Sequence, residues 1–201
     1  MLLALAMLIV SCQQDPAPVR AACGGGDAPA PAVVSETRLM ADVAALAADS
    51  MQGRAVGSEG GLKARRYLAA RIRGLRLDTL DALERPFAAP TQGDSTRRGA
   101  NLVAYVPGTR ARGPWLLVTA HYDHVGMRGS EVYNGADDNA SGTAAVLAMA
   151  EHFRAHPPAH PIMLVWLDGE ERGLVGSAAF VSSPPVPLAD VAVDVNLDMV
   201  G

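Results

Sequence analysis

The sequence predicts an α/β domain built on an open, largely parallel but mixed sheet that is flanked by helices. Short apolar runs typical of buried strands alternate with longer stretches of helical periodicity. Most of these runs end in polar residues able to do chemistry, as at the carboxyl edge of a parallel sheet. The chain has 201 residues, 49% of them hydrophobic, which suffices for one such core and not for two.

The first residues predict export and do not belong to the fold. The run from Met1 to Val10 is apolar throughout but too short to cross a bilayer, which is typical of a signal peptide. It ends in Ile-Val-Ser-Cys, which resembles a bacterial lipobox, so we expect residues 1–12 to be a signal peptide and Cys12 to carry a lipid. The alternative is an ordinary secretory signal that is cleaved nearby. In either case the protein is expected to be secreted or periplasmic.

The rest of the chain divides into a tether and one domain. Residues 13–34 are rich in Pro, Ala and Gly and predict an unstructured tether, which leaves residues 35–201 for the domain. The net charge of −4 gives no reason to expect a nucleic-acid partner. The only membrane contact that we expect is a lipid anchor at Cys12.

Two helices are expected before the sheet. Apolar residues recur at helical spacing over residues 36–49 and again over 59–75. The basic residues of the second stretch most simply form its solvent-exposed face. The segment between the two helices, QGRAVGSEG, predicts a loop.

The sheet is expected from four apolar runs further along the chain. Strands are predicted at 101–106, 115–120, 162–167 and 191–197, the last three of them buried. Helices are predicted at 140–154 and 173–181, and Asp138 or Asn139 is available to cap the first of these.

Polar clusters follow the last three strands. His121-Tyr122-Asp123-His124 follows the first, Asp168-Gly169-Glu170-Glu171 the second, and Asp198 the third. Asp137 and Asp138 lie in the loop that enters the helix at 140–154. Because the carboxyl ends of parallel strands share one edge of the sheet, we expect these clusters to converge.

Converging carboxylates predict a metal centre. The only cysteines, Cys12 and Cys23, precede the domain, so histidine and carboxylates are the available ligands, a set suited to Zn²⁺. More carboxylates than one ion can use suggest two ions roughly 3.5–4 Å apart, with a carboxylate between them. One of the two adjacent aspartates would bridge the ions, and the other would cap the helix or support the loop.

The segments HYDHVG, NGADDNASG, DGEERGLVGS and NLDMVG together resemble the zinc metallopeptidases of the M28 aminopeptidase family. The resemblance runs from about residue 36 to the end and includes QGRAVGSEG and RGANLVAYVPG. It implies that His121, Asp137, Glu171 and Asp198 bind zinc, with Asp137 bridging both ions and followed by a cis peptide to Asp138. It also implies that Asp123 orients His121 and that Glu170 is the general base.

The resemblance implies a zinc-dependent aminopeptidase that acts on peptides through a water activated by two Zn²⁺ ions. Two alternatives stay open. One is a single-zinc enzyme similar to glutaminyl cyclases, which share this fold. The other is an inactive or binding-only fragment of such a domain.

The family pattern includes one more ligand, a histidine well after the NLDMVG segment, whereas this sequence ends at Gly201. The family does not use the position of His124 as a ligand, and His152, His156 and His160 are expected at the opposite edge of the sheet. We therefore expect the sequence to be the N-terminal part of such an enzyme. As written, it would bind one zinc weakly, if at all, and be nearly inactive.

Overall fold

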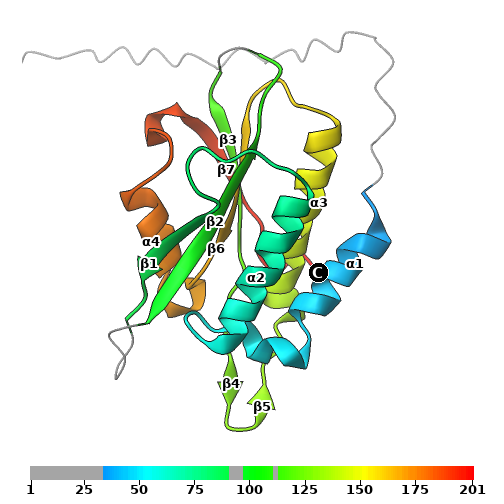
Figure 1. Ribbon diagram of the computed structural model, residues 1–201, viewed down its shortest axis with the longest axis vertical. Coiled ribbons are helices and arrows are strands. Elements are labelled where there is room, and N and C mark those ends of the chain that lie inside the picture. The colour runs from blue at the N-terminus through cyan, green and yellow to red at the C-terminus, as the bar shows by residue number, and fades with distance from the viewer. Residues whose placement is uncertain (1–33, 91–96, 111–112) are drawn as a thin grey trace, which may run out of the picture. The chain divides into compact units, whose positions relative to one another are not determined.

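The computed structural model describes residues 34–90, 97–110 and 113–201. Within them, five strands form a mixed sheet in the order β1–β2–β6–β3–β7 (Figure 1). These strands are β1 (Glu84–Ala88), β2 (Arg98–Val106), β3 (Trp115–His121), β6 (Ile162–Leu167) and β7 (Val191–Asn196). The predictions made for the signal peptide, Cys12 and the tether up to residue 33 lie outside the described residues.

The sheet is parallel on one side and antiparallel on the other. β3 pairs in parallel with both β6 and β7, whereas β2 pairs antiparallel with β6 and β1. The predicted mixed α/β sheet is therefore confirmed. β1 was not predicted, because its sequence Glu-Arg-Pro-Phe-Ala contains a proline and no continuous apolar run.

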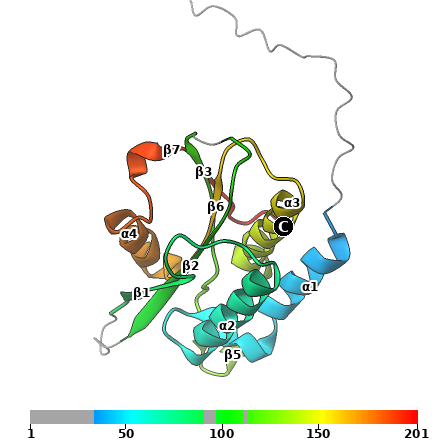
Figure 2. The same ribbon diagram turned by 45° about the horizontal axis from the view of Figure 1, so that its top comes forward.

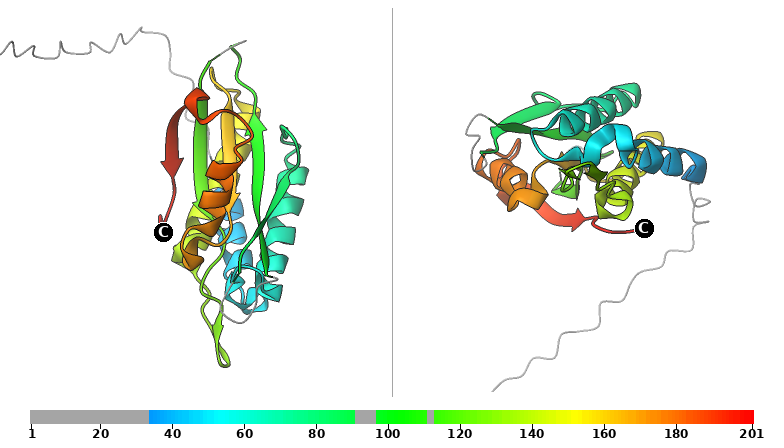
Figure 3. Two further views of the ribbon diagram at one scale, coloured as in Figure 1. Left: turned by 90° about the vertical axis from the view of Figure 1, so that its left-hand side faces the viewer. Right: turned by 90° about the horizontal axis from the view of Figure 1, so that it is seen from below.

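Helices cover both faces of the sheet (Figures 2 and 3). The helices α1 (Glu36–Leu46), α2 (Glu59–Gly74) and α3 (Gly142–Ala155) pack on one face, and α4 (Val175–Ser182) lies on the other. Alternate residues of β6 divide between two cores, as the two-residue period of a strand requires. Leu164 and Trp166 face the three helices, and Met163 and Val165 face Phe180 of α4.

The two parallel neighbours of β3, which are β6 and β7, differ sharply in burial. All six residues of β6 are buried at the centre of the sheet. The prediction that residues 191–197 form a buried strand was wrong in its burial, since Val193 and Val195 of β7 are 47% and 44% exposed. β7 is the last strand of the sheet, and among the described strands it pairs only with β3.

Short elements complete the fold. A two-residue hairpin, β4 (Met127–Arg128) with β5 (Glu131–Val132), projects beyond the sheet (Figure 1). The predicted loop between α1 and α2 contains a 3-10 segment, η1 (Asp49–Arg54). Three further irregular turns are η2 (Ala136–Ser141), η3 (Glu170–Arg172) and η4 (Leu188–Asp190). No described helix has the length and apolar composition needed to cross a bilayer.

Candidate metal centre

The predicted polar clusters meet at the carboxyl edge of the parallel strands. His121 is the last residue of β3, and Asp168 directly follows β6, two residues before η3 begins. Asp198 is the second residue after the end of β7. The fourth segment, η2, leads into α3 and carries Asp137 and Asp138. The topology thus brings together donors that are up to 77 positions apart, as the pair His121 and Asp198 shows.

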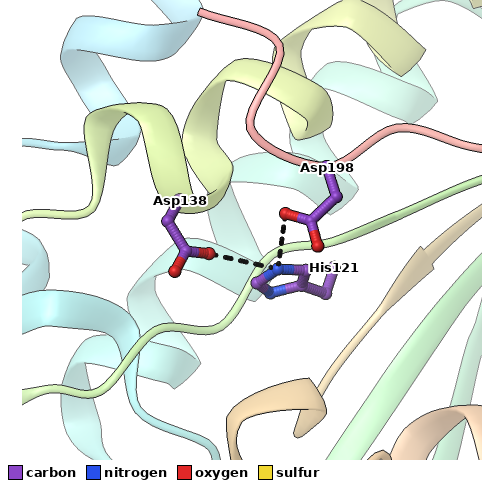
Figure 4. Close-up of side chains that lie close together, drawn as sticks. All are labelled: His121, Asp138 and Asp198. Atoms are coloured by element: carbon purple, nitrogen blue, oxygen red, sulfur yellow. Dashed lines mark ion pairs between the residues drawn. The ribbon is translucent and has the colours of Figure 1, made fainter.

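The first group of donors is His121, Asp138 and Asp198 (Figure 4). His121 Nε2 lies 3.3 Å from Asp138 Oδ1 and 3.4 Å from Asp198 Oδ1. Bonds of about 2.0–2.1 Å at tetrahedral angles place two zinc ligands about 3.3–3.4 Å apart. One imidazole nitrogen and two carboxylates at this separation fit a zinc ion.

The second group shares a carboxylate with the first. It consists of His124, Asp138 and Glu171, with His124 Nδ1 2.7 Å from Glu171 Oε1 and 3.8 Å from Asp138 Oδ2. The two oxygens of Asp138 therefore face different groups, Oδ1 toward His121 and Oδ2 toward His124. A carboxylate in this position can bridge two ions.

The structure places Asp138, and not the predicted Asp137, in both groups of donors, whereas which aspartate binds metal stays a prediction. Asp137 Oδ1 instead accepts a hydrogen bond of 3.1 Å from the Gly201 amide, and the Asp137 carbonyl accepts one from the Ser141 hydroxyl. The cis peptide bond also lies one residue later than expected, between Asp138 and Asn139. The sequence could not separate the two aspartates, because η2 has no regular periodicity.

The structure also brings His124 close to the donors, although it was predicted to lie outside the ligand set. Its side chain is 12% exposed and faces Glu171 and Asp138. The prediction relied on the family pattern alone. The position of His124 just beyond β3, three residues after His121, is the sequence signal that could have included it.

Asp123 is a fully buried carboxylate that contacts two of the segments that carry the donors. Its oxygens accept hydrogen bonds from the backbone amides of Glu170 (2.9 Å) and Glu171 (3.3 Å). His121 Nδ1 lies 3.6 Å from Asp123 Oδ1 and 3.2 Å from the Asp123 carbonyl oxygen, so that Nε2 is directed at the carboxylates. Burial lowers the pKa of His121, but the hydrogen bond and charge of Asp123, with the charges of Asp198 and Glu170, raise it to about 9.

Glu170 lies beside the first group without belonging to either group. It lines a cavity of about 530 Å³ together with His121 and Asp198. Burial raises the pKa of Glu170, His121 opposes this, and the charges of Glu171, Asp123 and Asp198 add to it. A half-buried carboxylate that adjoins the donors, but is not among them, is placed to move a proton.

The sequence did not reveal the role of Arg54, which is fully buried under the centre. Its guanidinium donates to the backbone carbonyls of Tyr122 (2.9 Å), Asn134 (2.6 Å) and Gly135 (2.8 Å), and also to that of Leu46. Burial lowers its pKa to about 10, so it stays charged at neutral pH. A single arginine in a loop of small residues was the only signal in the sequence.

Asn139 connects the loop of Asp138 to the segment of Asp198. Its side-chain oxygen accepts from the amides of Gly142 (2.9 Å) and Met199 (3.3 Å), and its side-chain nitrogen donates to the Leu197 carbonyl (2.9 Å). The prediction that Asp138 or Asn139 is the N-cap of α3 was wrong, since the N-cap is Ser141, but Asn139 does accept a hydrogen bond from the amide of Gly142, the first residue of the helix.

The fold and these donors define an α/β protein with a zinc-suited centre at the carboxyl edge of its sheet. The family model described as "Peptidase family M28" matches residues 101–201, which is half of the chain. The chain therefore belongs to peptidase family M28, as its motifs predicted.

The names of two curated relatives are consistent with this family. The chain is 30% identical over 149 residues to a "Probable zinc metalloprotease" of Pyricularia oryzae, a match that covers 69% of this chain and 29% of that protein. It is 40% identical over 87 residues to "Aminopeptidase YwaD" of Bacillus subtilis, covering 43% of this chain and 18% of that protein. The chain thus spans less than a third of the length of these curated relatives.

Solved structures share the fold. A zinc aminopeptidase from Bacillus subtilis, BSAP, matches with a TM-score of 0.70 at 17% sequence identity. The match covers 82% of this chain and 69% of the BSAP chain. A glutaminyl cyclase from Tannerella forsythia matches with a TM-score of 0.66 at 18% identity over 85% of this chain and 63% of its own. At these identities the likeness concerns the architecture of the sheet and its helices.

Proposed function

We propose that this chain supplies the metal centre of a zinc-dependent aminopeptidase that binds two Zn²⁺ ions and removes N-terminal residues from peptides. The observation that carries the proposal is the position of Asp138, whose two carboxylate oxygens face two separate donor groups. Membership of family M28 and the similarity to aminopeptidase YwaD support the same activity.

Each residue of the centre has a distinct task in this proposal. His121, Asp138 and Asp198 would hold one zinc ion, and Asp138 and Glu171 would hold the other. When bound, zinc polarises a carbonyl and lowers the pKa of a coordinated water. Asp123 fixes both the ring of His121 and the backbone that carries Glu170 and Glu171, so that ligands and base keep one relative position.

Glu170 acts as the general base in the proposed reaction. Its carboxylate takes a proton from the attacking water and passes it to the amine that leaves. A substrate whose free α-amine lies near the metal positions and the acidic side chains would be cleaved at its N-terminus, which would make the enzyme an aminopeptidase.

The substitution Glu170→Gln tests this role. It keeps the shape of the side chain and removes the base, so we expect zinc to stay bound and kcat on aminoacyl p-nitroanilides to fall by roughly 10²–10⁴-fold. The control is Glu131→Gln in the exposed β4–β5 hairpin, which should leave both values unchanged. The experiment uses a form of the protein that includes the later histidine of the family pattern, and near-normal turnover of its Glu170→Gln variant would show that another group is the base.

A second candidate is glutaminyl cyclisation at a single zinc ion. It is favoured by the shared fold with the Tannerella enzyme and by the His124–Glu171 distance of 2.7 Å, a hydrogen-bond separation. The products discriminate the two reactions on a peptide with an N-terminal glutamine. An aminopeptidase releases free glutamine, whereas a cyclase releases ammonia and leaves the peptide chain intact.

A further inference from the structure

We propose that Asn101 of β2 is a positioning residue that fixes the turn carrying Glu170 and Glu171. This segment, residues 168–176, is named the Glu170 turn below. The inference rests on the proposed function, in which Glu170 is the general base and Glu171 a zinc ligand. Asn101 acts through the turn and not on the substrate, because it is only 2% exposed and its amide is engaged within the protein.

Asn101 holds both ends of the Glu170 turn. Its side-chain oxygen accepts a hydrogen bond of 3.0 Å from the Asp168 amide, and its side-chain nitrogen donates one of 2.8 Å to the Gly176 carbonyl. Asp168 directly follows β6, and Gly176 lies in the first turn of α4. The element η3, which begins at Glu170, lies between these two residues. One side chain therefore closes the segment that carries the base.

The two ends of the Glu170 turn lie against each other. A Cβ atom added at Gly176 would collide with the Asp168 carbonyl oxygen and would lie 2.7 Å from Asn101 Oδ1. The Val175 amide also donates a hydrogen bond of 3.1 Å to the Gly169 carbonyl, just inside the two ends. In a loop closed this tightly, a shift at the ends displaces the residues between them.

Two buried side chains hold the Glu170 turn from the two sides of β6. Asp123, which follows β3, accepts hydrogen bonds from the amides of Glu170 and Glu171 in the middle of the turn. Asn101 on β2 binds the two ends, and β2 and β3 are the neighbours of β6 in the sheet. Asp123 alone would leave the turn free to pivot about its middle, and Asn101 removes that freedom.

The two ends require a side chain that both accepts and donates. An amide offers an acceptor and a donor on one planar group, which matches the Asp168 amide and the Gly176 carbonyl. Leucine has the same branched skeleton as asparagine but no polar atom. Asn101→Leu therefore fills the space, removes both hydrogen bonds and leaves two backbone groups unpaired.

The experiment compares the kinetics of Asn101→Leu, Glu170→Gln and the double variant, with zinc in excess, in a form of the protein that includes the later histidine of the family pattern. We expect Asn101→Leu to lower kcat on aminoacyl p-nitroanilides by roughly 10²-fold with KM unchanged, since a displacement of about 1 Å has an effect of this size. In the Glu170→Gln background, Asn101→Leu should lower kcat no further, because residues that act through one group are not additive.

Asp42→Ala is the matched control for a general loss of stability. It removes a buried acceptor between α1 and α2 and leaves the contacts of the Glu170 turn intact, so kcat should not change. Asn101→Ala is the second variant, to be used where leucine prevents folding, because it removes the same two hydrogen bonds without adding methyl groups.

Hydrogen exchange gives a readout that does not need turnover. We expect the protection of the Glu170 and Glu171 amides to fall by about ten-fold or more in the Asn101 variants, and to be unchanged in Asp42→Ala. Unchanged protection of these two amides would overturn the inference, and so would losses of kcat that multiply in the double variant.

Failure of the proposed function looks different from failure of this inference. If the unaltered protein releases no amino acids from peptides, the aminopeptidase is rejected. Exchange at the Glu170 and Glu171 amides then still decides whether Asn101 fixes the Glu170 turn.

Discussion

Three ionisable residues are buried at or near the candidate metal centre. At most 3% of the surface of each residue is exposed, and all three lie at or beneath the carboxyl edge of the sheet: Asp123, Arg54 and Asp168. Asp168 was predicted to join the converging cluster, but its carboxylate accepts a hydrogen bond of 3.0 Å from the Ala100 amide of β2 instead. Burial, followed by the charge of Asp123, raises the pKa of Asp168 to about 7.

Asp168 makes stability depend on pH in a defined direction. Its pKa in the folded protein exceeds the ordinary value near 3.8, so the folded state holds the proton more tightly than the unfolded chain. The resulting stabilisation is present below about pH 4 and is lost as the pH rises to about 7. We expect Asp168→Asn to flatten this decline, by a few kcal/mol at most, since one pKa unit corresponds to about 1.4 kcal/mol.

Urea unfolding of both proteins at one fixed zinc concentration, from pH 4 to pH 8, measures the effect of Asp168. The difference between the two curves isolates this carboxyl from the other titrating groups. Parallel curves would mean that Asp168 has the same pKa in both states.

At the scale of elements, α1 and α2 are joined by a polar contact within an apolar interface. Asp42 of α1 is 3% exposed and accepts two hydrogen bonds from Arg71 of α2, at 2.7 and 2.8 Å. The Tyr67 hydroxyl donates to the same carboxylate. Helical spacing predicted both helices but not this contact, because the pattern of apolar residues carries no information on which charged residue is buried.

We expect Asp42→Ala to destabilise the domain by about 2 kcal/mol, since it leaves Arg71 and Tyr67 without their buried acceptor. The midpoint of urea unfolding measures this change. Glu151→Gln is the comparison, because Glu151 pairs with Arg38 on the exposed surface and such pairs contribute little. Equal losses of stability in the two variants would contradict the expectation that the buried contact of Asp42 stabilises the domain more than the exposed pair of Glu151.

The predictability of each element follows from how it is buried. β3 and β6 were predicted closely because their continuous apolar runs reflect burial on both faces. β7 was also predicted to be buried, but its sequence Val-Ala-Val-Asp-Val-Asn is less apolar than the other two and it is an exposed edge strand. The four residues of β4 and β5 are too few to produce a period.

For the whole molecule, the sheet topology explains why the site was largely predictable. The rule that parallel strands end at one edge predicts that His121, Glu171 and Asp198 converge, and the structure places them there. Their roles as ligands stay predictions. The choice of Asp138 over Asp137 depends on the path of an irregular turn, and the position of His124 depends on packing against that turn; neither follows from a periodic pattern.

The central claim is that Asp138 joins two metal positions at the carboxyl edge of the sheet. Zinc bound per chain tests it most directly, compared between Asp138→Asn and Asp137→Asn in a form of the protein that includes the later histidine of the family pattern. Both substitutions remove one negative charge from adjacent residues, so a general loss of charge affects them alike. We expect Asp138→Asn to lose both ions and Asp137→Asn to retain both, whereas zinc loss confined to Asp137→Asn would contradict the claim.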